Sequence, residues 1–220
     1  TGGTTGLSKG AILTHRNLVA NIIQITTFLG ARIKEGEEVV VTAIPLYHIF
    51  ALMVNCLSYF SKGGRNVMIT NPRDMPGFVQ TLGNYRFSVI TGVNTLFNGL
   101  LHTPGFAELD FSALKLSAGG GTAIQEAISN KWREVTGQHI TEGYGLSETS
   151  PVVTFNLAGR DEFTATIGIP MPSTDVTLRD DDGNEVAMGE PGELCVKGPQ
   201  VMVGYWRKPE ETAAVTTADG

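Results

Sequence analysis

Residues 114–145 read LKLSAGGGTAIQEAISNKWREVTGQHITEGYG, which contains two short apolar runs separated by a segment of helical periodicity. We predict a strand over 114–118, a helix over 124–136 and a second strand over 139–144. A strand, a helix and a strand in this order are typical of a βαβ unit, in which the two strands run parallel. The stretch therefore predicts an α/β fold built on a parallel sheet.

The same alternation continues toward the start of the chain. Thr14 is a suitable N-cap for a helix that ends at Gly30, with an apolar stripe of Leu18, Ile22, Ile25 and Leu29. Further strands are predicted over 38–44, 66–69 and 87–91, and further helices over 49–60, 75–85 and 95–101. Because strands and helices alternate at short intervals, we expect a layered, largely parallel sheet with flanking helices.

The pattern changes near residue 170. Two alternating segments, Asp175–Arg179 and Glu193–Lys197, follow, and the first leads into the hairpin-type turn Asp181-Asp182-Gly183-Asn184. We therefore predict an α/β subdomain over residues 1–170 and part of a small antiparallel β-barrel subdomain over residues 171–220.

Composition narrows the function classes. The 220 residues carry a formal net charge of −6, which argues against a nucleic-acid partner. Cys56 and Cys195 lie far apart in apolar contexts, so we expect buried free thiols and a reducing compartment. The four histidines lack the spacing of a zinc site. No apolar run reaches the roughly 18 residues of a membrane-spanning helix.

The segment Thr1–Gly10 is rich in glycine and hydroxyl side chains and contains Lys9. Successive backbone N–H groups, hydroxyls and one lysine can surround a phosphate, although a flexible Gly/Thr linker is the alternative. The Walker pattern requires Ser or Thr directly after the lysine. Here Ser8 precedes Lys9 and Gly10 follows it, which disfavours a Walker-type site.

Three unusual segments follow predicted strands: Pro45–His48, Ser117–Gly121 and Glu142–Glu148. Ligands of parallel α/β sheets bind beyond the carboxyl ends of the strands, so we expect the three segments to meet. Tyr144 between two glycines suits stacking on a planar base, and Glu148 beside Ser147 offers oxygen ligands to magnesium. The alternatives are a tight glycine turn, a structural histidine and a tyrosine packed over a turn.

Together these segments resemble the adenylate-forming superfamily, and within it the bacterial long-chain fatty-acid–CoA ligases. Thr1–Gly10 is similar to the phosphate loop of that family, and Tyr144-Gly145-Leu146-Ser147-Glu148 to its Tyr-Gly-x-Thr-Glu motif. Pro45–Leu52 resembles its aromatic/His gate and Ser117–Gly121 its adenine-side loop. A later motif matches Gly192, Glu193, Leu194, Gly198, Met202, Gly204, Tyr205, Trp206, Pro209 and Glu210.

The resemblance implies a two-step reaction, in which ATP activates a long-chain fatty acid to acyl-AMP with release of pyrophosphate and coenzyme A then takes the acyl group. It implies catalytic roles for Lys9, Ser147, Glu148 and His48, with Mg²⁺ at Glu148. It implies nucleotide contacts from Thr1, Gly2, Gly3, Thr4, Thr5, Lys9, Gly119, Gly120, Gly121, Glu142, Gly143, Tyr144 and Ser147. The acyl pocket is expected to involve Phe50, Val93 and Gly168.

The resemblance also sets expectations for the rest of the protein. The family's ribose-binding Asp and its C-terminal domain with a catalytic lysine have no match here, so we expect a central piece that is nearly inactive alone. We expect the full-length enzyme in the cytoplasm, in peripheral contact with the inner face of a membrane. The alternatives are an aryl-CoA ligase, an acyl-AMP ligase, a peptide-synthetase adenylation domain or a non-catalytic scaffold.

Overall fold

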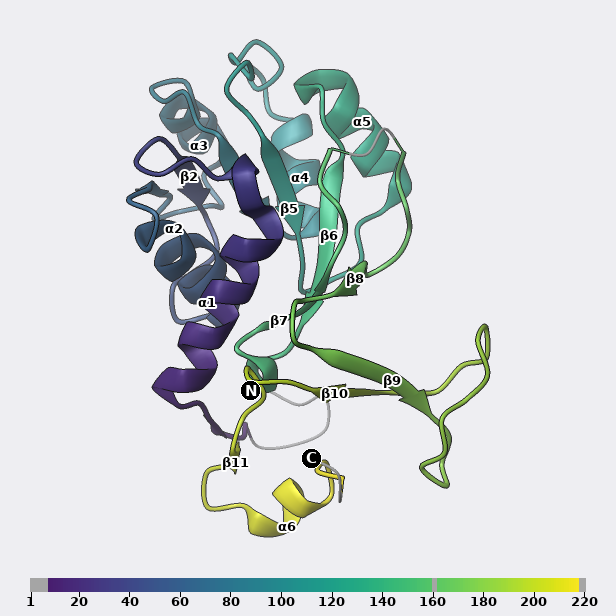
Figure 1. The fold of residues 1–220 in the computed structure, drawn as a ribbon. Coiled ribbons are helices and arrows are strands. Elements are labelled where there is room, and N and C mark those ends of the chain that lie inside the picture. Colours follow the sequence, from purple (N-terminus) through teal and green to yellow (C-terminus); the bar gives the residue numbers. More distant parts are fainter. Residues whose placement is uncertain (1–7, 160–161, 218–220) are drawn as a thin grey trace.

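The computed structural model describes residues 8–159 and 162–217. At its centre lies a seven-stranded sheet in the order β3-β2-β4-β5-β6-β7-β8 (Figure 1). Its parallel strands are β3 Arg65–Met68, β2 Val39–Thr42, β4 Val89–Gly92, β5 Leu116–Gly119 and β6 Ile140–Gly145. The antiparallel strands β7 Val152–Phe155 and β8 Ile169–Pro170 extend it at one edge. The predicted, largely parallel sheet is confirmed, and the antiparallel edge was not predicted.

Helices cover both faces of this sheet (Figure 1). One core contains side chains of α3 Met75–Leu82, α4 Asn94–Leu101 and α5 Glu126–Thr136. The other contains side chains of α1 His15–Leu29 and of α2 Ser58–Phe60. The neighbours Val40 and Val41 of β2 are both fully buried and belong to opposite cores. A β-branched run buried on both faces therefore confirms the predicted α/β layers.

Helix α1 begins and ends where the sequence predicts. Thr14 Oγ1 accepts a hydrogen bond from the backbone N–H of Asn17, and Gly30 follows the last turn. The predicted apolar stripe is only partly right, because Leu18 and Ile22 are half-buried. The rest of the buried face is polar: the side-chain amides of Asn17, Asn21 and Gln24 donate to the backbone carbonyls of Pro199, Val152 and Pro172 respectively.

The predicted helix over 49–60 contains a π-helix, Ala51–Leu57, that continues into α2. Asn55 is fully buried within it. Its Nδ2 donates to Thr91 Oγ1 at 2.7 Å and to Thr42 Oγ1 at 3.1 Å, which joins the π-helix to β4 and β2. π-helical turns are rare and often lie at functional sites. Here the π-helix directly follows His48 and Phe50.

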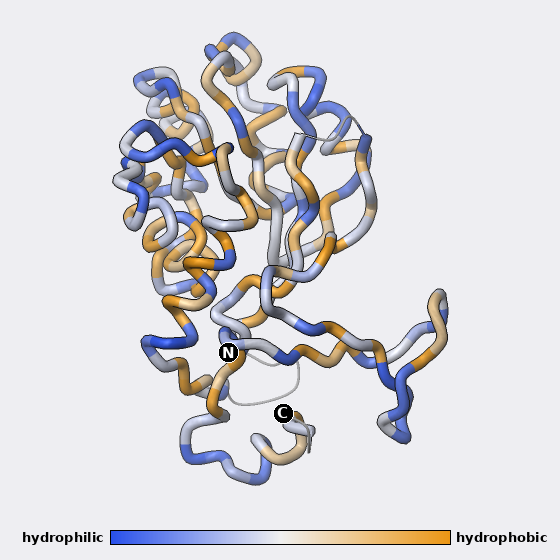
Figure 2. The backbone as a smooth tube through the Cα atoms, viewed as in Figure 1, coloured by the Kyte–Doolittle hydropathy of each residue, from blue (hydrophilic) through white to orange (hydrophobic). Residues whose placement is uncertain are grey.

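Between residues 171 and 217 the strands take part in small antiparallel pairs. The hairpin of β9 Asp175–Arg179 and β10 Glu193–Lys197 extends away from the large sheet (Figure 1). Its Asp180–Asn184 turn is hydrophilic (Figure 2), and Gly183 has the positive φ expected of the predicted turn. β1 Ala11–Ile12 pairs with β11 Gly204–Tyr205, ahead of α6 Pro209–Ala213. A subdomain boundary near residue 170 stays a prediction.

Both cysteines are free thiols, as predicted, but each is half-buried rather than buried. In the ranges 8–159 and 162–217, none of the helices has the length and apolar character needed to cross a membrane.

Candidate active site

A pocket of about 360 Å³ opens at the carboxyl ends of β5 and β6. All three segments singled out in the sequence contribute to its lining: His48, Gly119 to Gly121, and Gly143 to Glu148. The other lining residues are mostly apolar, among them Ile25, Phe28, Leu29, Val54 and Met171. The pocket thus joins a glycine-rich polar rim to an apolar wall formed by α1 and the sheet. The expectation that the three segments meet is confirmed for these residues.

Two glycines of the turn Gly119-Gly120-Gly121 are explained by the local geometry. A Cβ on Gly119 would lie 2.7 Å from Ile124 Cγ1, which is too close for any side chain. Gly121 has a φ of +78°, which disfavours other residues, whereas a Cβ on Gly120 would make an ordinary contact with the ring of Phe50 at 3.4 Å. The turn carries no side chains of its own, so its backbone lines the pocket directly, beside the ring of Phe50.

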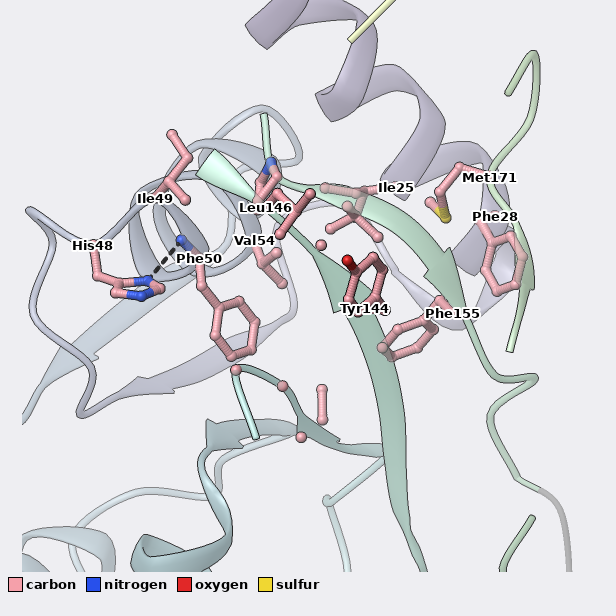
Figure 3. A pocket seen from close by; sticks show the side chains of 18 of the residues that line it. Ile25, Phe28, His48, Ile49, Phe50, Val54, Tyr144, Leu146, Phe155 and Met171 are labelled. Atoms are coloured by element: carbon pink, nitrogen blue, oxygen red, sulfur yellow. Dashed lines mark hydrogen bonds between the residues drawn. The ribbon is translucent and has the colours of Figure 1, made fainter. Parts of the chain in front are cut away.

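Tyr144 projects into the pocket between Phe50 and Phe155 in the view of Figure 3. The flanking glycines permit close packing of β7: a Cβ on Gly143 would overlap the ring of Phe155, and one on Gly145 would overlap the carbonyl of Pro151. Tyr144 is half-buried, so part of its ring stays accessible to a ligand. The geometry allows stacking on a base, but the glycines themselves are explained by the antiparallel partner strand.

His48 lies at the exposed rim of the pocket, ahead of the π-helix. Its Nδ1 accepts a hydrogen bond from the backbone N–H of Phe50 at 3.2 Å (Figure 3). In the neutral ring the proton is therefore on Nε2. The adjacent ring of Phe50 packs over Gly120. This pair connects the π-helix to the glycine turn.

Ser147 and Glu148 begin the short 3-10 helix Ser147–Thr149 after β6, and both line the pocket. Glu148 Oε1 accepts a hydrogen bond from the hydroxyl of Tyr205 at 2.8 Å. Burial, followed by this hydrogen bond, raises the pKa of Tyr205 to about 12, so the hydroxyl is a proton donor at neutral pH. No local sequence pattern relates Tyr205 to Glu148, so this contact could not be predicted from the sequence.

Lys9 lies next to the same tyrosine. Its ammonium is 4.8 Å from the centroid of the Tyr205 ring and 2.9 Å from Glu211 Oε2. Hydrogen bonds from Lys208 and Lys9 lower the pKa of Glu211, so this carboxyl is ionised at neutral pH. Of the predicted phosphate loop, Thr1, Gly2, Gly3, Thr4 and Thr5 lie outside the described residues.

Glu142 differs from the other predicted nucleotide contacts. Its Oε1 accepts a hydrogen bond from the backbone N–H of Ile124 at 2.8 Å, in the segment that leads into α5. Glu142 lines a second cavity, of about 240 Å³, rather than the first. Of the three residues expected in the acyl pocket, Phe50 lines the first cavity, and Val93 and Gly168 do not.

The donor set suits magnesium that arrives with a nucleotide. Mg²⁺ is commonly held by one or two carboxylates together with substrate phosphates and water. The pocket supplies the Glu148 carboxylate and the Ser147 hydroxyl. No group of three or more His, Cys, Asp or Glu side chains able to hold a metal lies within the part of the chain that the structure describes.

Comparison with known proteins identifies relatives along almost the whole chain. A family model described as "AMP-binding enzyme" matches residues 1–206. A long-chain-fatty-acid–CoA ligase of Yersinia pestis is 57% identical over 212 residues, which are 96% of this chain and 38% of that protein. A ligase of the same name from Haemophilus influenzae is 50% identical over 98% of this chain and 39% of that protein. The chain thus spans less than half the length of these relatives.

The fold has close counterparts among solved structures. The crystal structure of ATP-bound MatB from Rhodopseudomonas palustris matches with a TM-score of 0.84 and 29% identity, over 99% of this chain and 42% of that one. The order of the motifs, the pocket at the strand ends and the family match over residues 1–206 agree. The chain belongs to the family of AMP-binding, adenylate-forming enzymes.

Proposed function

We propose that the full-length protein is a long-chain fatty-acid–CoA ligase. The observation that carries the proposal is the pocket itself, whose glycine-rich rim with Tyr144, Ser147 and Glu148 continues into an apolar wall. Such a pocket suits a nucleotide at the rim and an alkyl chain against the wall. The 57% identity to a long-chain ligase over 96% of the chain supports the same substrate class.

In the first step, a carboxylate oxygen of the fatty acid attacks the α-phosphorus of ATP. A new oxygen–phosphorus bond forms, the bond between the α-phosphorus and the bridging oxygen breaks, and pyrophosphate leaves with the electron pair. We assign Tyr144 to the adenine and Gly119 to Gly121 to its edge. Ser147 donates a hydrogen bond to the α-phosphate or the carboxylate. Lys9 neutralises the β- and γ-phosphates, together with the loop Thr1–Thr5.

In the second step, the thiol of coenzyme A loses its proton to solvent and its sulfur attacks the acyl carbon. The bond between that carbon and the phosphate oxygen breaks, and AMP leaves. We assign His48, which is exposed at the rim of the pocket, to the passage where the acyl group meets ATP or the thiol. No protein nucleophile is needed, so the chain contributes alignment, which in well-oriented systems is worth about 7–11 kcal/mol.

Glu148 is the residue that would hold magnesium, which when bound offsets charge on the phosphates. We also propose a subdomain boundary near residue 170, a cytoplasmic location and peripheral contact with the inner face of a membrane. The last two rest on the family resemblance.

The test uses the full-length protein, ATP and a panel of acids. We expect ATP–pyrophosphate exchange that depends on palmitate, and palmitoyl-CoA on addition of coenzyme A. Exchange supported by benzoate or an amino acid but not by palmitate would assign another substrate class. Accumulation of palmitoyl-AMP in the presence of coenzyme A would make the protein an acyl-AMP ligase. Absence of exchange with every acid would support the non-catalytic scaffold.

A further inference from the structure

One short segment, residues 202–206, contacts both of the residues assigned to the phosphate end of ATP. The backbone N–H of Met202 donates to the carbonyl of Glu148 at 2.7 Å. On the other side, the N–H of Trp206 donates to the carbonyl of Gly10 at 2.7 Å, directly after Lys9. Glu148 and Lys9 are remote in sequence, but the backbones of Glu148 and of Gly10, the neighbour of Lys9, are both hydrogen-bonded to this segment.

Tyr205 makes the corresponding side-chain contacts. Its hydroxyl donates to Glu148 Oε1 at 2.8 Å, and its ring lies 4.8 Å below the Lys9 ammonium. Tyr205 is itself fixed, because it pairs with Ala11 across β1 and β11 and its N–H donates to Thr212 Oγ1 at 2.9 Å. A single half-buried side chain thus touches the carboxylate and the cation at once.

The hydroxyl and the ring of Tyr205 act on their partners in different ways. A hydrogen bond orients the carboxylate, and a carboxylate that accepts one bond keeps lone pairs for a cation. The ring supplies a cation–π contact, which holds an ammonium at a set distance without neutralising its charge. Glu211 adds an ion pair to Lys9 at 2.9 Å.

We propose that Tyr205 is a positioning residue of the adenylation step, which sets the separation between the Glu148 carboxylate and the Lys9 ammonium before ATP binds. The proposal rests on the proposed function. The two contacts of the side chain have separate effects. The hydroxyl increases the gain in ATP affinity that Mg²⁺ provides, and the ring increases the affinity for ATP without Mg²⁺.

Two variants of the full-length protein separate these parts. Tyr205→Phe keeps the ring and removes the hydroxyl, and Tyr205→Leu removes both. The affinity for ATP is measured by calorimetry in EDTA and at saturating Mg²⁺, and the Mg²⁺ dependence of pyrophosphate exchange is measured alongside. Tyr85→Phe, an exposed tyrosine after α3, is the matched control.

We expect Tyr205→Phe to bind ATP normally in EDTA and to lose about tenfold of the gain from Mg²⁺, in line with a hydrogen bond to a charged group. We expect Tyr205→Leu to be weaker in EDTA as well. Equal losses for Tyr205→Phe with and without Mg²⁺ would indicate a merely structural role and overturn the proposal, as would no loss. If Tyr205→Leu does not fold, the Tyr205→Phe measurements alone test the proposal.

A wild-type protein that binds ATP without palmitate-dependent exchange would overturn the proposed function. The Mg²⁺ comparison would still test the role of Tyr205.

Discussion

Gly143 of β6 lies directly opposite Phe155 of β7, so close that a Cβ on Gly143 would overlap the phenyl ring. We expect Gly143→Ala to lower the free energy of unfolding by about 1–3 kcal/mol, because an added methyl has no space there. Thermal unfolding and hydrogen exchange of the β6 and β7 peptides in the full-length protein measure the effect.

A second substitution checks the cause. Phe155→Leu in the Gly143→Ala background should restore much of the stability, because the smaller side chain can move away. Gly145→Ala is the matched control, since its methyl would meet the backbone carbonyl of Pro151, which Phe155→Leu does not move. Equal rescue of both alanine variants would contradict the steric explanation.

This pair also shows what the sequence could and could not predict. The strands and helices of the βαβ units were predictable, because their apolar periodicity is local. β1, β8 and β11 are two residues long and carry no periodicity to recognise. The glycines beside Tyr144 suggested an open ring, whereas their close contacts come from β7 and Pro151, which only the fold brings together.

The candidate site likewise has a part that the sequence could predict and a part that it could not. The sequence predicted that the segments of His48, Gly119 to Gly121 and Tyr144 to Glu148 meet, because strand ends of a parallel sheet share one edge. It could not predict the partners Tyr205 and Glu211, because a hydrogen bond and an ion pair between remote residues leave no local pattern. The buried amides of α1 were missed for the same reason.

The ion pair of the buried Glu38 with Lys115 predicts how the stability of the fold depends on pH. Glu38 is 2% exposed, and its Oε1 lies 2.6 Å from Lys115 Nζ. Burial alone would raise the pKa of Glu38, but hydrogen bonds from Lys115, the N–H of Lys34 and Ser88 outweigh it and lower that pKa below 4.5. The pair therefore stabilises the fold above pH 4.5, and this contribution is lost as the pH falls through the lower, folded value.

Removal of Lys115 should reverse that sign. Lys115→Met leaves Glu38 buried without its cation, so we expect a loss of about 3 kcal/mol at pH 7, at the low end for buried pairs because Lys115 is partly exposed. Desolvation then raises the pKa of Glu38, and stability should increase as the pH falls from 7 toward 5. Lys62→Met, which removes an ion pair with the exposed carboxylate of Glu35, is the control and should change stability by less than about 1 kcal/mol. Parallel pH curves for wild type and Lys115→Met would contradict the assignment.

The hydrogen bonds of the Asn55 amide predict that substitution of Asn55 destabilises the fold and that a second substitution restores much of the lost stability. Asn55→Leu removes the partner of the buried Thr91 hydroxyl, and an unsatisfied buried group costs about 1–3 kcal/mol. Adding Thr91→Val removes the unpaired hydroxyl and should recover a large part of the lost stability. Urea unfolding measures both, and hydrogen exchange over residues 48–57 reports on the π-helix at the pocket rim. Failure of the double variant to gain on Asn55→Leu would contradict this role for the network.

Glu142 offers a direct comparison between contact with the nucleotide and support of the glycine turn. Its carboxylate accepts from the N–H of Ile124, a residue that is 4% exposed, so Glu142→Ala leaves a buried donor unpaired and should cost about 1–3 kcal/mol of stability. Glu142→Gln keeps an acceptor and should lose less than half of that. Because Glu142 lines the second cavity and its carboxylate is bonded to the N–H of Ile124, we expect Glu142→Gln to bind ATP within twofold of wild type, while Glu142→Ala binds more weakly through a displaced turn. Calorimetric titration of the full-length variants with ATP decides: an equally large loss of affinity in a stable Glu142→Gln protein would mean that the carboxylate contacts the nucleotide directly.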